Sequence, residues 1–270
     1  MKAYVRRLAW LLIRLLPESF IQELRRRRYL RVLKQADAGE PELEVIAALL
    51  QPGATCIDIG ANFGVYTVAL SKMVGAQGRV ISIEPMPQTY TMLAKNIAQL
   101  GLANTQSLQC AVSDLDGEVT MTVPRWNYGP PNFYEAHITD ARDAIGGVTI
   151  MSRRLDSIIA QLEADVSFIK CDVEGHELSV LKGAPETLQR GAAWFIEVSG
   201  DPDSTTSNAS QVIHLMNAAG YQTYRYADGL IAPRIKGDQF INYFFLQSRH
   251  VERLRAAGLL EVNISKVAPL

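Results

Sequence analysis

A glycine-containing loop and an acidic residue further along the chain could together bind a nucleoside. The loop begins at Asp58 and reads DIGANFG. Gly60 and Gly64 let the backbone turn tightly and approach a ligand because no Cβ intervenes, and Asn62 is one of the few other residues that tolerate positive φ. Glu84 follows Gly64 by twenty residues. A carboxylate at the tip of the next strand can accept hydrogen bonds from both ribose hydroxyls.

Two details of this loop indicate what kind of nucleoside it binds. The third glycine of the dinucleotide fingerprint is missing, because Val65 stands in its place. Asp58 adds a negative charge that would repel a pyrophosphate but attract a sulfonium ligand with a free ammonium group. The pattern favours a sulfonium nucleoside and disfavours an NAD-dependent oxidoreductase, which stays open as an alternative. The purely structural interpretation is a strand-to-helix turn beside an exposed acid.

Two acids and a histidine follow a later apolar run, residues 166–171. Asp172, Glu174 and His176 lie where a parallel strand ends, and parallel-sheet folds place ligands beyond the carboxyl ends of their strands. His176 has a side-chain pKa suited to a general base. Such a base accelerates attack by a hydroxyl about 10²–10⁴-fold. Asp172 could be the base itself, orient His176 or contact the ligand's ammonium group, and His176 could instead be a helix-start residue at the rim.

A divalent metal is the rival interpretation of the same region. Asp172 ends one predicted strand and Glu197 ends the next. Two carboxylates on the ligand side could hold Mg²⁺, which lowers the pKa of a bound hydroxyl. Because only two carboxylates are suitably placed, we assign no metal ligands and keep Mg²⁺ as an alternative.

The elements that must position these residues alternate between strand and helix. The apolar runs predict strands at 55–59, 79–83, 106–112, 166–171 and 192–198, and helical spacing occurs at 65–73, 90–100, 155–162, 177–182 and 211–219. This order predicts a doubly wound α/β fold with a mostly parallel sheet and helices on both faces. No helix separates the predicted strands 221–226 and 242–246, so we expect them to form a hairpin that makes the last strand antiparallel.

The sequence resembles the FkbM family of methyltransferases. The resemblance covers residues 54–200 and is carried by DIGANFG at 58–64, IEP at 83–85, Asn96, AVSD at 111–114, LDS at 155–157, IKCDVEGHE at 169–177 and LKG at 181–183. It implies a class I (Rossmann-like) methyltransferase fold and transfer of a methyl group from S-adenosylmethionine, usually to oxygen. The acceptor is often a hydroxyl of a sugar or natural product, and it differs between members.

With this donor, each candidate residue has an expected role. Asp58 and Gly60 would hold the methionine end, and Glu84 would hold the ribose. Ala111 would flank the adenine, with Ser113 or Asp114 near its amino group. Asp172, Glu174 and His176 are the catalytic candidates, and Asp172 is also a candidate donor ligand. A non-catalytic donor-binding protein attached to a membrane is a further alternative, which the intact acidic cluster disfavours.

The insertion at 124–147 is predicted to be irregular and is rich in proline, glycine and aromatic residues. Aromatic faces beside polar groups suit a sugar or another planar ring, and packing onto the domain is the alternative. The candidates are Trp126, Tyr128, Phe133, Tyr134 and His137. We therefore expect a small-molecule or glycan acceptor.

The charges are unevenly distributed along the 270 residues. Residues 1–34 contain ten Lys or Arg against two Glu, although the whole chain has a net charge of −1. A basic head, residues 1–40, therefore precedes an acidic domain at 41–250, with a tail at 251–270. The negative charge of this domain would repel phosphates, so we do not expect the protein to bind nucleic acid. The three cysteines lie in apolar runs that are expected to be buried, and no apolar run is long enough to span a membrane. We therefore expect a cytoplasmic protein.

The basic head has two candidate roles. Leucines recur at helical spacing over residues 8–16, and Pro17 interrupts that pattern before a second, arginine-rich stretch. Such a segment can lie on the inner membrane face as a peripheral contact. The alternative is that it packs on the domain as a lid over the donor or forms part of a dimer contact.

Overall fold

The computed structural model describes residues 18–34, 39–124, 136–138 and 147–261. The chain divides into two compact units, Met1–Gly39 and Glu40–Leu270. The described part of the first unit is helix α2 (Glu18–Lys34), and the leucine pattern at 8–16 lies outside the described residues. Among the described residues, no helix is long and apolar enough to cross a membrane.

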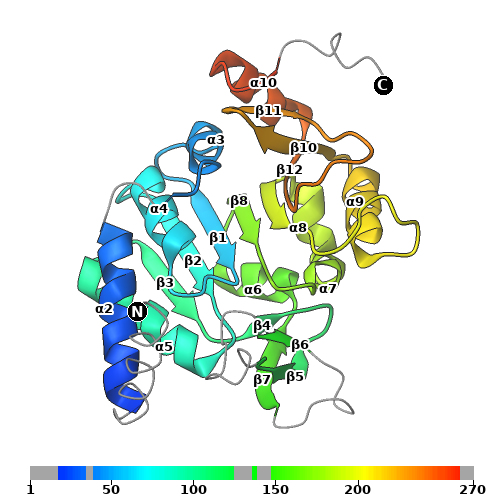
Figure 1. The fold of residues 1–270 in the computed structure, drawn as a ribbon. Coiled ribbons are helices and arrows are strands. Elements are labelled where there is room, and N and C mark those ends of the chain that lie inside the picture. The colour runs from blue at the N-terminus through cyan, green and yellow to red at the C-terminus, as the bar shows by residue number, and fades with distance from the viewer. Residues whose placement is uncertain (1–17, 35–38, 125–135, 139–146, 262–270) are drawn as a thin grey trace, which may run out of the picture. The chain divides into compact units, whose positions relative to one another are not determined.

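The second unit is built on one large sheet (Figure 1). Its strands are, in spatial order, β11 (Leu230–Pro233), β10 (Gln222–Ala227), β12 (Asn242–Leu246), β9 (Ala193–Glu197), β8 (Val166–Cys171), β1 (Thr55–Ile59), β2 (Arg79–Ile83) and β3 (Thr105–Leu108). Five of them, β3, β2, β1, β8 and β9, run parallel, and β12 is antiparallel to both β9 and β10. The predicted α/β fold with an antiparallel last strand is confirmed.

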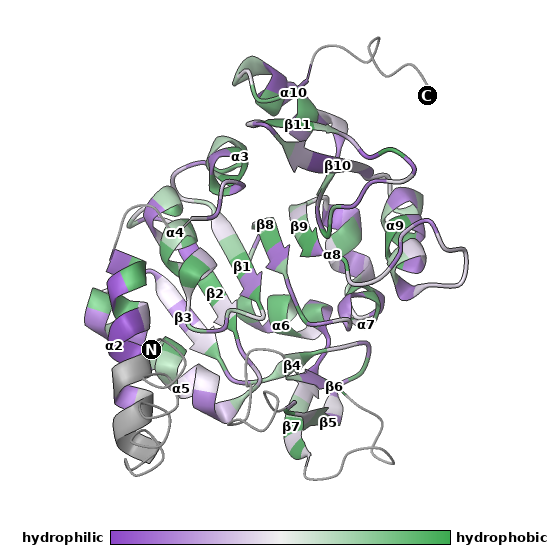
Figure 2. Cartoon of the chain, viewed as in Figure 1, coloured by the Kyte–Doolittle hydropathy of each residue, from purple (hydrophilic) through white to green (hydrophobic). Residues whose placement is uncertain are grey.

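Helices cover both faces of this sheet because its central strands are buried on both sides. In β1, Ile57 and Ile59 belong to one hydrophobic cluster and Cys56 to the other, and Figure 2 shows mainly hydrophobic colours on β8 and β9. The first cluster is covered by α6 (Leu155–Leu162), α7 (Glu177–Lys182), α8 (Pro185–Arg190) and α9 (Asn208–Ala218). The second is covered by α3 (Leu43–Leu49), α4 (Val65–Val74) and α10 (Ser248–Ala256), while α5 (Pro87–Leu100) packs beside β3.

A second, smaller sheet was not predicted from the sequence. Its order is β4 (Ala111–Val112), β7 (Val148–Arg153), β5 (Gly117–Thr122) and β6 (His137–Ile138). The single strand expected at 106–112 is therefore two strands in different sheets. The chain leaves the large sheet after Leu108, whose carbonyl oxygen accepts a hydrogen bond from Glu84 N, and β4 then pairs with β7 instead.

The insertion at 124–147 connects strands of this small sheet. Strand β5 precedes it and β7 follows it, and the two are antiparallel partners. His137 lies in β6, which extends the small sheet through its pairing with β5. The other four aromatic candidates, Trp126, Tyr128, Phe133 and Tyr134, fall outside the described residues.

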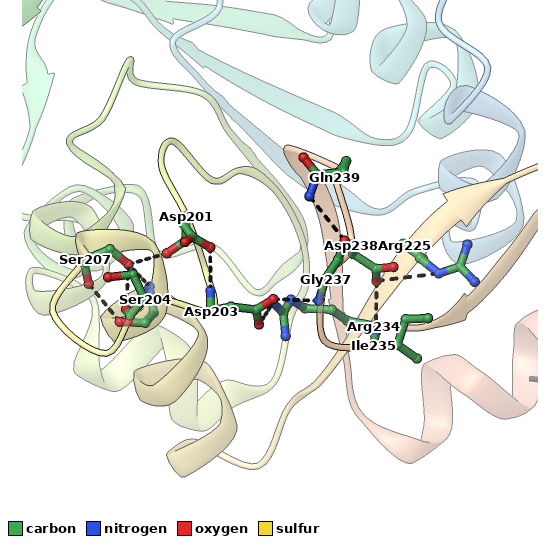
Figure 3. Close-up of polar contacts among 11 residues, drawn as sticks. Asp201, Asp203, Ser204, Ser207, Arg225, Arg234, Ile235, Gly237, Asp238 and Gln239 are labelled. Carbon is green, nitrogen blue, oxygen red and sulfur yellow. Dashed lines mark hydrogen bonds and ion pairs between the residues drawn. The ribbon is translucent and has the colours of Figure 1, made fainter. Parts of the chain in front are cut away.

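Two loops at the β9–β12 side of the large sheet are tied together by polar contacts (Figure 3). The Arg234 guanidinium bonds the Asp203 carboxylate, and the same carboxylate accepts a hydrogen bond from Gly237 N at 2.6 Å. Asp238 accepts from Ile235 N at 2.8 Å and lies 3.5 Å from Arg225 Nε. These contacts fix the loop that follows β9 against the loop that precedes β12.

The C-terminal end of the unit differs from the expected arrangement in two ways. Strand β11 was not predicted, because it is short and ends at Pro233. It pairs with β10, which therefore lies between β11 and β12. Residues 251–270 were expected to be a tail, yet α10 buries Leu254 and the following turn buries Leu259, both in the second hydrophobic cluster. The described C-terminal residues are thus part of the domain.

Candidate active site

A cavity opens where the carboxyl ends of β1, β2 and β8 meet the small sheet. Its volume is about 630 Å³ when counted out to its open mouth. The lining residues come from the first loop, the tips of β2 and β8, and strands β4, β5 and β6. They include seven sequence-predicted site residues, namely Gly60, Asn62, Glu84, Ala111, Asp172, Glu174 and His176. The structure therefore brings the predicted donor and catalytic residues together.

The first loop lies against the tip of β8. Gly60 has φ 71°, and a Cβ atom at this position would lie 1.8 Å from the carbonyl oxygen of Asp172. Asn62 adopts φ 52°, which confirms the expected positive φ. Gly64 does not line the cavity; it has φ 104° and is the N-cap residue of α4. Only glycine at position 60 allows the loop and β8 to approach this closely.

Glu84 connects the tip of β2 to this loop. One carboxylate oxygen accepts a hydrogen bond from Asn62 N at 2.9 Å, and the other accepts from Met86 N at 3.1 Å. Burial raises the pKa of Glu84 to about 7, although both backbone donors act in the opposite direction. Each oxygen keeps a further lone pair, so the carboxylate can also accept hydrogen bonds from a ligand in the cavity.

A buried lysine behind the loop holds two predicted site residues in place. Lys170 Nζ donates hydrogen bonds to Asp172 Oδ2 at 3.0 Å and to the Gly60 carbonyl oxygen at 3.2 Å, and it lies 3.8 Å from Asp58 Oδ1. Burial alone would lower the pKa of Lys170, but Asp172 and Asp58 outweigh it, and the pKa lies above its usual value. The charged lysine therefore joins the loop to the tip of β8.

Asp58 does not line the cavity, contrary to its expected contact with the donor. Its side chain is fully buried and accepts a hydrogen bond from Thr67 Oγ1 at 2.6 Å. Complete burial raises the pKa of Asp58, while Lys170 and Thr67 oppose this shift. Asp58 thus supports the site from behind. Lys170 was not among the residues predicted from the sequence. A lysine inside the apolar run 166–171 nevertheless indicates a buried ion pair.

A tight turn after β8 presents the acidic cluster. Glu174 has φ 51° and Gly175 has φ 92°. Glu177 is 2% exposed and accepts a hydrogen bond from Gly175 N at 2.8 Å. Glu177 therefore stabilises the turn, whereas Asp172 and Glu174 line the cavity.

His176 is the N-cap residue of α7, lines the cavity and contacts Ser113, which follows β4. Its Nε2 lies 2.8 Å from Ser113 Oγ, and Ser113 Oγ donates a hydrogen bond to Asp114 Oδ1 at 2.9 Å. Burial lowers the pKa of His176, with Asp114 opposing the shift. This shift favours the neutral imidazole, which can accept a proton. Ser113 was expected near an adenine amino group, but its hydroxyl is engaged by His176 and Asp114.

The Mg²⁺ alternative gains no support from the described residues. No group of three or more His, Cys, Asp or Glu side chains among them could hold a metal ion. Glu197, the second expected ligand, does not line the cavity. Burial raises the pKa of Glu197 to about 7, and repulsion by Asp172 and Glu174 acts in the same direction.

The lining of the cavity includes both polar and apolar groups, and this combination fits the donor. Gly60, Asn62 and Asp172 contribute polar groups, and the Asn62 side-chain oxygen has no hydrogen-bond partner among the described residues. The apolar side chains of the lining include Ile83, Met86, Cys110, Val112, Met121, Ala136 and Ile138. Apolar side chains suit an adenine base, the Glu84 carboxylate suits a ribose, and polar groups suit an amino acid.

Comparison with known proteins identifies matching methyltransferases. The family model of the methyltransferase FkbM domain matches residues 58–223. Methyltransferase sdnD of Sordaria araneosa is 28% identical over 48% of this chain and 60% of its own length. Hexuronic acid methyltransferase AglP of Haloferax volcanii is 27% identical over 63% of this chain and 68% of its own.

A solved structure shows the same fold. The crystal structure of Methyltransferase FkbM from Methylobacillus flagellatus matches with a TM-score of 0.50 and 19% identity. The match covers 76% of this chain but 47% of that one, so the chain spans about half of the solved protein. Together with the strand order, this confirms the class I methyltransferase fold.

Proposed function

Because the chain belongs to the FkbM family of methyltransferases, we propose that it transfers the methyl group of S-adenosylmethionine to a hydroxyl of a sugar, glycan or natural product. The observation that carries the proposal is one cavity whose lining includes both the candidate donor-binding residues Gly60, Asn62 and Glu84 and the histidine His176. When bound, S-adenosylmethionine supplies a methyl group on a positively charged sulfur. Transfer is an in-line displacement, so the protein's main task is alignment.

The donor would contact both the apolar and the polar residues that line the cavity. Ala111 and Met86 would flank the adenine, and the Glu84 carboxylate would accept hydrogen bonds from the ribose hydroxyls. Asn62 and Asp172 would face the ammonium group. Asp58 would act indirectly, since it lies behind Gly60 beside Lys170.

Donor affinity should depend on pH through Glu84. Its pKa is about 7, and only the ionised form offers all of its acceptor sites to the ribose. We expect the affinity for S-adenosylhomocysteine to fall about tenfold from pH 8 to pH 6. Calorimetry at both pH values measures this change. In Glu84→Gln the affinity should be weaker and nearly independent of pH, and an unchanged pH dependence in that variant would assign the titration to another group.

His176 is the proposed general base, with Asp172 and Glu174 beside it at the mouth of the cavity. His176→Ala should lower kcat by about 10²–10⁴-fold, because the hydroxyl loses its proton acceptor, and should leave the affinity for S-adenosylhomocysteine nearly unchanged. Asp172→Asn should reduce both quantities. His214→Ala, on the exposed face of α9, is the matched control. Wild-type turnover in His176→Ala would place the base elsewhere.

A carbohydrate acceptor is supported by the relative from Haloferax volcanii, whose name gives hexuronic acid as its substrate. Incubation of cell extract with isotope-labelled S-adenosylmethionine, followed by mass spectrometry, tests the acceptor class. We expect label on a sugar or other small-molecule hydroxyl. Label confined to protein or nucleic acid would contradict the proposal.

We also propose that the basic head contacts an anionic membrane surface. Arg27, Arg28, Arg31 and Lys34 are exposed on α2, and each cation near such a surface contributes up to about 1 kcal/mol. Full-length protein should co-sediment with anionic vesicles at low salt and be released at high salt. A variant with these four residues changed to glutamine should stay in the supernatant. Equal binding to neutral vesicles, or no binding at all, would reject the idea.

A further inference from the structure

Three side chains form a continuous hydrogen-bonded line from the cavity wall to solvent. His176 lines the cavity, Ser113 is 3% exposed, and Asp114 is exposed at the surface. The two contacts measure 2.8 Å from His176 Nε2 to Ser113 Oγ and 2.9 Å from Ser113 Oγ to Asp114 Oδ1.

The backbone around Ser113 is fixed from two sides. Ser113 N donates a hydrogen bond to the carbonyl oxygen of Arg153 at 3.0 Å, which ties it to the end of β7. Gly183, at the end of α7, lies so close that a Cβ there would be 2.0 Å from the Ser113 carbonyl oxygen. Because His176 is the N-cap residue and Gly183 the C-cap residue of α7, the serine and the histidine are both positioned by this helix.

The direction of these hydrogen bonds follows from the number of protons. A serine hydroxyl has one proton to donate and lone pairs with which to accept. In the structure this proton is donated to Asp114 Oδ1. With that arrangement Ser113 Oγ accepts from His176, and Nε2 carries the ring proton. In a neutral imidazole the other nitrogen, Nδ1, is then the proton acceptor.

We propose that Ser113 and Asp114 are positioning residues that hold His176 in its Nε2–H tautomer and leave Nδ1 to take the proton of the acceptor hydroxyl. This inference rests on the proposed function. During transfer the acceptor oxygen bonds the methyl carbon as the carbon–sulfur bond breaks, and the hydroxyl proton moves to Nδ1. The resulting imidazolium donates from Nε2 to Ser113, whose hydroxyl points to the Asp114 carboxylate, so the new positive charge is stabilised. Nδ1 releases the proton to water after the product leaves.

The tautomer can be measured without knowing the acceptor. Nitrogen-15 NMR of the histidine-labelled full chain with S-adenosylhomocysteine reports which ring nitrogen of His176 is protonated, and His176→Ala assigns the signal among the four histidines. We expect the Nε2–H tautomer in the wild-type protein. Ser113→Ala should give a mixture of tautomers, and Asp114→Asn should do the same because the serine proton can then turn toward His176. An Nδ1–H tautomer in the wild-type protein would overturn the proposal.

A matched control separates this role from general packing. Ser152→Ala removes another buried serine hydroxyl in the small sheet, one that bonds the Leu115 carbonyl oxygen at 2.9 Å, and should leave the tautomer unchanged. If Ser113→Ala fails to fold, the exposed Asp114→Asn still provides the test.

Turnover distinguishes the failure of this inference from the failure of the proposed function. With an acceptor in hand, Ser113→Ala and Asp114→Asn should each lower kcat, by less than the loss of about 10²–10⁴-fold expected for His176→Ala, with little change in the KM for the donor. Wild-type turnover in His176→Ala would show that His176 is not the general base, and this result would contradict that part of the proposed function. The positioning role alone would be overturned if His176→Ala is inactive while Ser113→Ala and Asp114→Asn both keep the wild-type tautomer and the wild-type turnover.

Discussion

Replacing Gly60 with alanine is expected to abolish binding of S-adenosylhomocysteine and to destabilise the fold by more than about 4 kcal/mol, which only backbone strain or severe core damage normally reaches. A left-handed conformation costs a residue with a Cβ roughly 1–2 kcal/mol. The added Cβ would also lie 1.8 Å from the Asp172 carbonyl oxygen, so the loop and the tip of β8 must separate. Chemical denaturation and calorimetry measure the two effects.

Gly101→Ala is the matched control for this prediction. Gly101 has φ 66°, close to the 71° of Gly60, but a Cβ there would meet nothing within 4 Å. It should therefore cost only the conformational energy, roughly 1–2 kcal/mol, and leave donor affinity unchanged. Equal losses of stability in both variants, with donor binding intact in Gly60→Ala, would show that the close approach to β8 does not build the site.

Replacing Lys170 with methionine should destabilise the protein by roughly 3–5 kcal/mol, the range for removing one partner of a buried ion pair. The variant keeps most of the side-chain volume but leaves Asp58 and Asp172 facing each other without the cation between them. Donor affinity should fall too, because the hydrogen bond from Nζ to the Gly60 carbonyl oxygen is lost. Urea unfolding at neutral pH gives the change in the free energy of unfolding.

A second substitution tests the electrostatic origin of that loss. Adding Asp58→Asn to Lys170→Met removes the buried negative charge and should restore part of the stability. The double variant should therefore be more stable than the single Lys170→Met variant. A loss below about 1 kcal/mol in Lys170→Met, the value of an exposed pair, would mean that the three charges are not coupled.

Much of the large sheet was predictable because its strands are short apolar runs that end at turn residues. Strands β1, β2, β8 and β12 occupy the predicted residues 55–59, 79–83, 166–171 and 242–246. The ends of β2 and β8 place Glu84 and Asp172 at one edge of the sheet, which is why residues that line the same cavity could be predicted from the sequence.

The small sheet was not predictable for a physical reason. Strands β5 and β7 pair across the insertion, and β4 pairs in parallel with β7. Both strands are only six residues long, and the sequence does not show which segment each of them pairs with. The line from His176 to Ser113 depends on this sheet, so it could not be derived from the sequence either.

Asp58 lies outside the cavity lining because the face of a strand on which a side chain lies decides which groups the side chain contacts. Ile57 and Ile59 face the helices α6 to α9, so Asp58 points to the opposite face, toward Thr67 of α4. In the pairing of β1 with β8, Asp58 is the direct neighbour of Lys170. This register is a tertiary property. It places Asp58, which was expected to contact the donor, beside the buried Lys170.

Calorimetric titration of the full chain with S-adenosylhomocysteine, with NADH as the competing ligand, tests the central claim most directly. The cavity is lined by the Glu84 carboxylate, which would hold a ribose, by apolar side chains that would suit an adenine, and by polar groups at Asn62 and Asp172. We therefore expect saturable binding of S-adenosylhomocysteine in the micromolar range, displaced by S-adenosylmethionine and unaffected by NADH. Saturable binding of NADH with no response to S-adenosylhomocysteine would contradict the account.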